Sequence, residues 1–395
     1  MKILFVTRGW PSKDNPMSGN YEAVQARALA KRGVEVTVAY LKKKCVSHIF
    51  ESRKIMQRED DGITVLSRTV VVAELPDVKT TRYGHLDSWL CQRAFLDLYE
   101  HYRKLKGDAD VIHAHLIVHA YNCHRVLEKY HIPFVITEHW SGVNSTNVNK
   151  NLSRLGDGYK WADKVICVSA ALAASLKMQF DIESQVIHNM VSDSFFRVTD
   201  LDNKKTSPDV VRFISVGSLV EIKRFDLLIN AFKNCQHLAE CKLSIIGSGP
   251  EEEKLANLIE ECGLKNKVFM LGRKKPEEVS ELMAASDCFI LTSNSETFGI
   301  VYIEAMAKGK PVIATICGGP ESFVNENNGI LIPAEDVDAT TKAIDYMVEK
   351  HDKYDNASIR QYCHDNFSEE AISEKIIGAY HEAIEKHNKT IWKSF

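Results

Sequence analysis

The chain has 395 residues, of which 45% are hydrophobic and 26% are charged. This balance is ordinary for a globular protein and excludes disordered, collagen-like and disulfide-scaffold classes, while the length predicts two domains. A formal net charge of −3 gives no global indication of a nucleic-acid binder.

Charge is divided unevenly along the chain. Residues 1–195 carry a net charge of +5 and residues 196–395 a net charge of −8. A mildly basic first half fits contact with an anionic partner or a membrane surface, and it also fits an ordinary solvated face. Both readings stay open for the basic segments at 42–44 and 51–58, where an anionic lipid or lipid diphosphate would bind.

The ten cysteines stand singly, without a CxxC pair, as reduced thiols do in cytosolic proteins. The apolar run at 3–6 is too short for a signal-peptide core, and no stretch approaches the roughly 18 apolar residues of a membrane span. We therefore expect a cytoplasmic protein, in at most peripheral contact with the inner face of a membrane.

Short β-branched runs alternate with longer helical patterns, which predicts parallel sheets covered by helices on both faces. The first half has predicted strands at 2–7, 34–40, 111–115, 134–139, 165–169 and 185–188, with helices such as 21–32 and 123–130. The second half has predicted strands at 211–216, 242–246, 267–271, 287–292, 311–315 and 329–332.

Two such series in tandem predict an α/β fold of two Rossmann-like, doubly wound domains that face a central cleft. We place the first domain at 1–190, a polar linker at 191–210 and the second domain at 211–367. Ligands of such sheets bind at the carboxyl ends of the strands, where the following helix offers unpaired amides. The turns from strand to helix are therefore the first places to search for a site.

The best such turn lies between residues 287 and 315. A polar loop with Glu296 leads into a predicted helix from about residue 300, so Thr297, Phe298 and Gly299 supply first-turn amides without an intrahelical acceptor. These amides suit a diphosphate or sugar hydroxyls. Glu304 lies one turn into the helix, where both carboxylates can accept hydrogen bonds from the hydroxyls of one ligand. Taken alone, the two glutamates are also explained as a helix cap and a solvated side chain.

The spacing Glu296-x7-Glu304, with ETFG at 296–299, resembles the signature of glycosyltransferase family 4, the retaining GT-B enzymes. Further segments agree with the family in order and spacing: DVIHAHL (110–116), IPFVITEH (132–139), ADKVICVS (162–169), VIHNMV (186–191), VGSLVEIKRFDLLINAF (216–232), IIGSGPEEEKL (245–255), EAMAKGKPVIAT (304–315), GGPESF (318–323) and NNGILIP (327–333). The resemblance covers nearly the whole chain except the region around 42–107. It implies a GT-B fold in which the second domain holds the donor nucleotide and the first holds the acceptor. The segment 368–395 would form a helix that packs back on the first domain.

The resemblance assigns roles in the turn just described. Glu296 and the amides of Thr297, Phe298 and Gly299 would hold the donor sugar. Glu304 would bind the ribose of the nucleotide.

The resemblance also assigns the donor diphosphate to the turn that begins with Gly217, at the end of the first strand of the second domain. Lys223 matches the family's lysine for that diphosphate. Ser218 stands where the family usually has an arginine, which removes one positive charge, and Arg224 is the candidate replacement.

Two residues of the first domain are assigned in the same way. Gly19 is the one glycine of MSGN (17–20), where the family has a pair, and it would let backbone amides approach the donor phosphates. His139, the last residue of TEH, corresponds to the family's histidine close to the donor sugar and the acceptor. We therefore count His139, Glu296 and Lys223 as candidate catalytic residues.

An NAD site is set aside because GSGP at 247–250 has Glu252 where the dinucleotide fingerprint needs its third glycine. A metal site is set aside as well. The Asp-x-Asp triplets at 108–110, 200–202 and 336–338 are predicted at an amino edge, in the linker and at the start of a surface helix. The histidines 113, 115 and 139 lack cysteine or carboxylate partners for zinc.

We therefore expect a metal-independent hexosyltransferase that moves a hexosyl group from a nucleoside diphosphate sugar to a glycan or lipid-linked glycan with retention of configuration. Cell-surface polysaccharide synthesis is the expected context, without a cofactor or nucleic-acid partner. Two alternatives stay open, a nucleotide-sugar epimerase of similar architecture and a non-catalytic glycan-binding homologue. The departures at Ser218 and around Gly19 favour the latter, and the retained Glu296, Glu304 and Lys223 argue against it.

Overall fold

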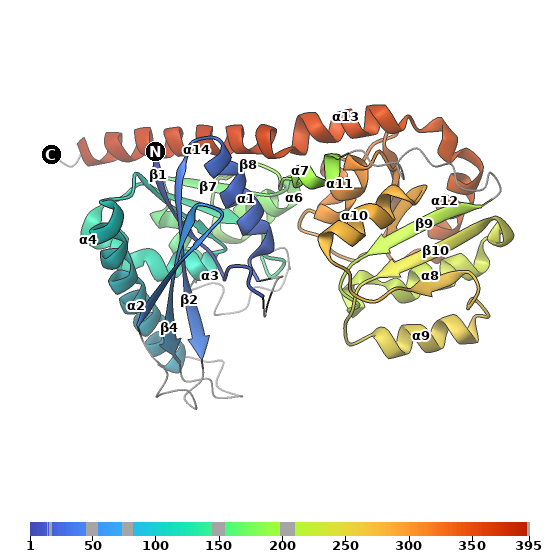
Figure 1. Cartoon of the computed structure of the whole chain (residues 1–395), viewed down its shortest axis with the longest axis horizontal. Coiled ribbons are helices and arrows are strands. Elements are labelled where there is room, and N and C mark those ends of the chain that lie inside the picture. The colour runs from blue at the N-terminus through green and yellow to red at the C-terminus, as the bar shows by residue number, and fades with distance from the viewer. Residues whose placement is uncertain are drawn as a thin grey trace. The chain divides into compact units, whose positions relative to one another are not determined.

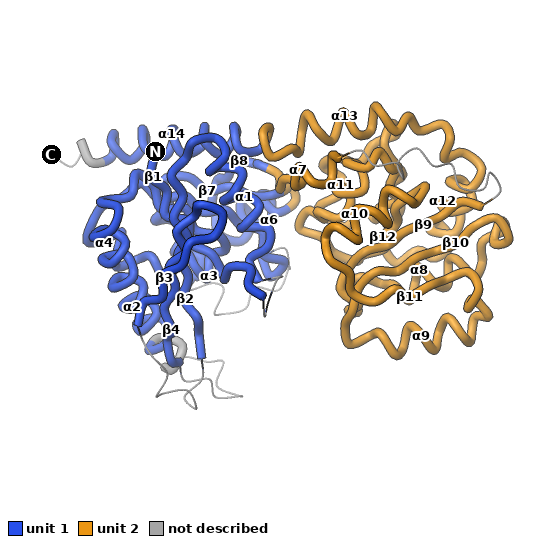
Figure 2. The backbone as a smooth tube through the Cα atoms, viewed as in Figure 1, with its two compact units in different colours: residues 1–168, 172–187, 372–395 blue, residues 169–171, 188–371 orange. Residues whose placement is uncertain are grey.

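The computed structural model describes residues 1–13, 15, 18–44, 54–72, 82–143, 155–197 and 210–392. The chain forms two compact units, coloured separately in Figure 2. Unit 1 comprises Met1–Val168, Leu172–Ile187 and Ile372–Phe395, and unit 2 comprises Ser169–Ala171 and His188–Ala371. The chain therefore returns to unit 1 with its last segment.

Unit 1 is built on an eight-stranded sheet of order β3-β4-β2-β1-β5-β6-β7-β8 (Figure 1). The strands are β1 (Lys2–Val6), β2 (Glu35–Lys44), β3 (Ile55–Asp60), β4 (Ile63–Val71), β5 (Val111–His115), β6 (Phe134–Glu138), β7 (Lys164–Cys167) and β8 (Gln185–Val186). Every residue of β5 and β6 is buried. Parallel strands covered on both faces read as such continuous buried runs, which explains why these strands were predictable.

The helices of this part of the chain are α1 (Asn20–Lys31), α2 (Arg82–Lys106), α3 (Ile117–Ala120), α4 (His124–Tyr130), α6 (Ala170–Phe180) and α14 (Glu369–Trp392), with 3₁₀ turns η2 (Tyr121–Cys123) and η3 (Asp157–Trp161). The helices α2 and α4 lie side by side (Figure 1). The last helix, α14, is fixed to unit 1 by its side chains. The Tyr380 hydroxyl lies 2.8 Å from Nδ1 of the buried His113, and His387 Nδ1 lies 2.9 Å from Asp163.

One edge of the sheet departs from the prediction of parallel pairing. Strands β3 and β4 pair antiparallel, and Asp61 and Gly62 between them both have positive φ, as a two-residue hairpin turn requires. Most of β3 is exposed, as befits an edge strand without an apolar core pattern. The dipeptide Asp-Gly indicates a hairpin, and it lies in the region around 42–107 that the family resemblance does not cover.

Unit 2 is built on a six-stranded, all-parallel sheet of order β11-β10-β9-β12-β13-β14. The strands are β9 (Val211–Val216), β10 (Cys241–Ile246), β11 (Val268–Met270), β12 (Cys288–Leu291), β13 (Val312–Ile316) and β14 (Gly329–Pro333). The helices are α7 (Asp193–Phe196), α8 (Phe225–Asn234), α9 (Glu252–Glu261), α10 (Pro276–Ala284), α11 (Ile300–Ala307), α12 (Val337–Lys350) and α13 (Asn356–Phe367), with 3₁₀ turns η4 (Glu221–Lys223), η5 (Leu238–Glu240), η6 (Pro320–Ser322) and η7 (His351–Lys353). Helix α8 packs against α9 and α12, and α11 against α10 and α13 (Figure 1). The predicted α/β class with two open, mostly parallel sheets is confirmed.

Part of the predicted linker at 191–210 packs within unit 2. The amide of Val191 donates to the carbonyl of Phe367 at 2.8 Å, and the amide of Asp193 donates to the carboxylate of Glu369 at 3.0 Å. Residues 198–209, which include the Asp-x-Asp triplet at 200–202, lie outside the described residues.

Candidate functional site

The loop after β12 leads into α11 through Gly299, which has φ +90° and ψ 66°. A Cβ at this position would lie 2.6 Å from the Tyr302 ring, so both the backbone and the space require glycine. Within the described chain, the amides of residues 297–301 donate no hydrogen bond. The loop therefore presents a row of free donors at a helix N-terminus, an arrangement that favours anions.

The Lys223 ammonium lies 2.5 Å from Oε1 of Glu296, and the Ser293 hydroxyl donates to the same oxygen at 2.8 Å. The Lys223 side chain is 22% exposed and the Glu296 side chain 9%, so the ion pair is largely shielded from water. No hydrogen bond to Oε2 of Glu296 occurs among the described residues. The pair thus fixes a cation beside the free amides and leaves one carboxylate oxygen open to a ligand.

Hydrogen bonds to backbone carbonyls hold the two loops of this pair together. The Thr292 hydroxyl donates to the Arg224 carbonyl at 2.8 Å, and the Asn294 amide donates to the Ile222 carbonyl at 2.8 Å. The ends of β9 and β12 are neighbours in the sheet, so residues 73 positions apart meet at one carboxyl edge.

Glu304 extends from α11 and is half-buried. It makes no hydrogen bond or ion pair with any residue in the described ranges. Burial raises the pKa of this carboxyl to about 7. A shielded carboxylate without a partner is suited to accept hydrogen bonds from ligand hydroxyls.

The remaining candidate residues of unit 2 are Phe298, Gly217 and Arg224, and each has a different environment. The Phe298 side chain is 1% exposed and stacks on His188 with ring centres 5.2 Å apart, so only its backbone faces the loop. The Gly217 carbonyl would lie 1.8 Å from a Cβ on Gly247, which brings two strand-end loops into close contact. Arg224 is engaged elsewhere, because its guanidinium bonds Asp226 at 3.0 and 3.2 Å and also Glu335.

His139 follows β6 in unit 1. Its Nε2 atom is buried and has no hydrogen-bond partner in the described part of the chain. Burial, and then the charge of Arg8, lower the pKa of His139 to about 4, so the ring is neutral at pH 7. Gly19, also in unit 1, has φ +66°, and a Cβ there would lie 2.2 Å from the Gly9 carbonyl oxygen.

The sequence analysis missed Glu138, which is wholly buried. Its Oε1 accepts hydrogen bonds from the amides of His139 (2.9 Å) and Trp140 (2.8 Å). Its Oε2 accepts from the Ile117 amide (2.9 Å) and the Tyr159 hydroxyl (2.6 Å). One carboxylate thereby fixes the backbone that carries His139, and the signal for it was an acid at the end of an otherwise apolar strand.

We expect Glu138→Gln to destabilise the protein by about 2–4 kcal/mol, because the amide nitrogen would face backbone donors and leave them unsatisfied. Tyr159→Phe removes only one of the four bonds and is the milder comparison. Denaturant unfolding measures both variants. Equal stability of Glu138→Gln and wild type would contradict the structural role.

Three of the residues set aside as metal ligands, Asp110, Asp336 and His113, have other partners. Asp110 accepts from the Lys2 amide at 2.7 Å, and Asp336 caps α12 by accepting from the Ala339 amide at 2.8 Å. His113 lies between Tyr380 and Thr137, at 2.8 and 2.7 Å. Within the described residues, no group of three or more His, Cys, Asp or Glu side chains is arranged to hold a metal ion.

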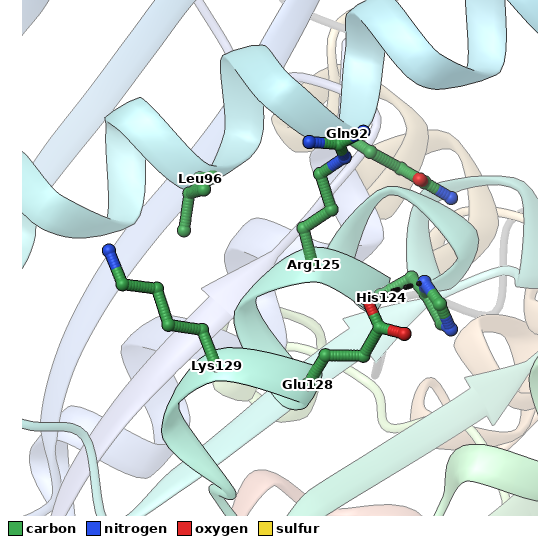
Figure 3. Close-up of a pocket in the computed structure, with 6 residues that line it drawn as sticks. All are labelled: Gln92, Leu96, His124, Arg125, Glu128 and Lys129. Carbon is green, nitrogen blue, oxygen red and sulfur yellow. Dashed lines mark ion pairs between the residues drawn. The ribbon is translucent and has the colours of Figure 1, made fainter.

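An open groove of about 520 Å³ lies between α2 and α4 in unit 1 (Figure 3). It is lined by Gln92, Leu96, His124, Arg125, Glu128 and Lys129. His124 and Glu128 pair at 3.4 Å, and Lys129 pairs with Glu100 at 2.6 Å. The lining side chains come from helices that cover the sheet, so we keep the groove apart from the strand-end site.

Solved structures with the same fold are found among known proteins. Sucrose-phosphate synthase from Thermosynechococcus elongatus superposes with a TM-score of 0.75 at 20% identity, covering 96% of this chain and 98% of that chain. HepE from Anabaena, in complex with UDP and glucose, gives a TM-score of 0.71 at 20% identity over 96% of this chain and 98% of its own. At such identity the likeness concerns the fold, which is that of the GT-B glycosyltransferases.

Two family models match most of the chain. The model "Glycosyltransferase Family 4" matches residues 21–195, and the model "Glycosyl transferases group 1" matches residues 199–364. The chain belongs to glycosyltransferase family 4. The expected family is confirmed, whereas the roles of its individual site residues stay predictions.

Curated relatives agree in class and differ in the product or biosynthesis that their names give. N-acetyl-alpha-D-glucosaminyl L-malate synthase of Bacillus anthracis is 26% identical over 70% of this chain and 74% of its own length. The lipopolysaccharide core biosynthesis glycosyltransferase LpsE of Rhizobium meliloti is 29% identical over 50% of this chain and 59% of its own length. The putative teichuronic acid biosynthesis glycosyltransferase TuaC of Bacillus subtilis is 25% identical over 87% and 88%. The match thus spans less than two thirds of LpsE.

Proposed function

We propose that this chain transfers a hexosyl group from a nucleoside diphosphate sugar to a hydroxyl of a glycan or lipid-linked glycan, with retention of the anomeric configuration. The observation that carries the proposal is the Lys223–Glu296 ion pair beside the free amides of residues 297–301. A cation and a row of amides match a diphosphate, and a carboxylate with an open oxygen matches sugar hydroxyls.

The names of similar proteins support this direction. TuaC is named for teichuronic acid biosynthesis and LpsE for lipopolysaccharide core biosynthesis, and HepE was solved with UDP and glucose. We therefore place the proposed reaction in the synthesis of a cell-surface polysaccharide.

The proposed donor site is divided among residues of unit 2. Lys223 and the amides of residues 297–299 receive the diphosphate, Glu296 the sugar and Glu304 the ribose. The turn at Gly217 lets the backbone approach the phosphates. Arg224 would also bind the diphosphate, after its guanidinium has left the carboxylates of Asp226 and Glu335.

The proposed step needs neither a covalent nucleophile nor a metal ion. The acceptor oxygen forms its bond to the anomeric carbon on the face from which the diphosphate leaves, and its proton passes to the departing phosphate oxygen. Lys223 and the free amides stabilise the charge that develops on that phosphate. His139 is neutral and so offers the sugar a hydrogen bond rather than a charge, and Gly19 keeps its proposed role beside the phosphates.

A donor panel followed by product analysis tests the proposal. Thermal shifts with nucleoside diphosphates and their sugars identify the donor, and proton NMR of the glycosylated product reports the anomeric configuration. An isomerised sugar from donor alone would favour the epimerase. Donor binding without release of nucleoside diphosphate to any acceptor would favour a glycan-binding homologue.

We also propose peripheral contact of unit 1 with an anionic membrane at the cytoplasmic face. Lys42 and Lys43 are exposed at the end of β2, and α2 exposes Leu86 (49%) and Trp89 (44%). No helix in the described residues is long and apolar enough to cross a membrane. The strand β2 and the helix α2 are in contact, and exposed basic and apolar side chains on neighbouring elements suit a lipid surface. Residues 51–53 of the second basic segment lie outside the described chain.

We expect the protein to sediment with vesicles that contain phosphatidylglycerol and to stay in the supernatant with phosphatidylcholine alone. The double change Lys42→Gln and Lys43→Gln should reduce sedimentation several-fold, because each basic residue near the surface contributes about 1 kcal/mol. The matched control is Lys265→Gln with Lys267→Gln in unit 2. Equal sedimentation of the two double variants would contradict the proposal.

A further inference from the structure

Several buried polar side-chain atoms of unit 1 make no hydrogen bond in the described part of the chain, and four of them belong to three side chains at one edge of the sheet. These four are both carboxylate oxygens of Glu22, Nε2 of His115 and Nε2 of His139. Glu22 is 1% exposed and His115 2% exposed. The great majority of buried polar atoms in folded proteins are hydrogen-bonded, so such a group points to partners that belong to a ligand.

The three side chains come to the same edge of the sheet. His115 ends β5, His139 follows β6, and Glu22 is the third residue of α1, the helix that follows β1. Strands β1, β5 and β6 are consecutive neighbours in the sheet. The rings of His115 and His139 are in contact, with centres 5.5 Å apart and planes nearly perpendicular.

Arg8, which follows β1, connects Glu22 to the two histidines. Its Nε lies 3.2 Å from Oε1 of Glu22, and its side chain is 45% exposed. Its charge also contributes to lowering the pKa of His115 and of His139, although burial is the larger cause for both. A ligand would reach the buried atoms from the side on which Arg8 is open to solvent.

The backbone fixes where α1 begins in this cluster. Gly19 precedes the helix with φ +66°, and a side chain there would lie 2.2 Å from the Gly9 carbonyl oxygen. The turn of β1 and the first turn of α1 are therefore in direct contact, which sets the place of Glu22.

The chemistry of the cluster favours hydroxyl groups over an anion. A carboxylate accepts hydrogen bonds from hydroxyls, and a neutral imidazole nitrogen accepts one or donates one. Burial raises the pKa of Glu22 and both histidines are uncharged at pH 7, so Arg8 is the one cation among these four side chains, and it already pairs with Glu22. A buried carboxylate also repels an incoming anion.

We propose that Glu22 and His115, together with His139, bind the hydroxyls of a neutral sugar acceptor. This inference rests on the proposed function and specifies its acceptor, namely an uncharged sugar at the residue that receives the hexosyl group. Glu22 and His115 thereby become acceptor-binding residues of unit 1.

The test uses three acceptor probes. Two are neutral, methyl α-D-glucopyranoside and methyl α-D-mannopyranoside, and the third is the anionic methyl α-D-glucopyranosiduronate. Saturation-transfer NMR without donor measures their binding, and release of nucleoside diphosphate measures their use. The variants are Glu22→Gln and Glu22→Met. The methionine side chain is similar in shape to that of glutamate and lacks the carboxylate that accepts hydrogen bonds from hydroxyls. Glu128→Gln, on α4 of the same unit, is the matched control, and circular dichroism checks that each variant folds.

We expect the neutral glycosides to bind wild type and the control, to bind Glu22→Met at least about tenfold more weakly, and the uronate not to bind. Unchanged binding to Glu22→Met, no binding to wild type, or preference for the uronate would each overturn the inference. Binding of a neutral glycoside, lost in Glu22→Met, without any turnover of donor would support the inference and overturn the proposed transferase reaction.

Discussion

Replacement of Lys223 by alanine is expected to lower turnover about a hundredfold or more, the scale of removing one preorganised electrostatic donor. The physical reason is that Lys223 is held by the buried Glu296 at 2.5 Å, next to amides that have no other acceptor. Ser218, exposed at the end of β9, supplies no second cation, and Arg224 is occupied by two carboxylates. Lys223 therefore carries most of the positive charge of the proposed diphosphate site.

Single-turnover and steady-state release of nucleoside diphosphate measure this effect. Lys233→Ala, on the exposed face of α8 in the same unit, is the matched control and should retain wild-type turnover. The free-energy loss of the double variant Lys223→Ala with Glu296→Gln should be smaller than the sum of the two single losses, because the two side chains are in contact.

The activity of wild type should survive a chelator. Loss of that activity, restored by magnesium or manganese, would contradict the metal-free proposal.

Replacement of Glu304 by glutamine is expected to raise the stability of the free protein and to weaken the binding of nucleotide. The pKa of about 7 in the folded protein lies above the ordinary value of 4.5. Folding therefore favours the protonated carboxyl, and wild type loses stability as pH rises from 4.5 to 7, with the full loss present above pH 7. Glu304→Gln removes this loss, and we expect it to stabilise the free protein by about 1–3 kcal/mol at pH 8.

The same substitution should weaken nucleotide binding by about 1–3 kcal/mol, since ribose hydroxyls lose a charged acceptor. The affinity of wild type should also fall as pH drops through 7, and this step should be absent in Glu304→Gln. Calorimetry with the nucleoside diphosphate chosen by thermal shift measures binding, and denaturant unfolding measures stability. Glu281→Gln on the exposed face of α10 is the control. Unchanged affinity in Glu304→Gln would remove Glu304 from the ribose site.

Local signals account for what the sequence predicted well. Strands such as β5 and β6 are short, continuously buried runs because both of their faces are covered, and the turn before α11 is marked by Gly299. These features depend on a few neighbouring residues and a fixed period, so they can be read without knowing the fold. The loop from Glu296 to Glu304 was accessible in the same way, since its residues are continuous in the chain.

Partnerships between distant residues were decided by the tertiary structure alone. Arg224 was the candidate replacement for the missing arginine, yet it pairs with Glu335, 111 positions further along. Glu22 carried no sequence signal of function, and Glu138 carried only that of an acid at the end of a strand. The importance of Glu138 lies in the four donors that its carboxylate accepts from, and that of Glu22 in the hydrogen bonds that its carboxylate lacks. Amino-acid sequence by itself determined the class, the strands other than β3 and β4, and the loop of the proposed donor site. The order of the strands in the sheet decides which charged side chains meet and which polar atoms make no hydrogen bond. It brings together residues that are far apart in the chain, and such pairs produce no periodic pattern in the sequence.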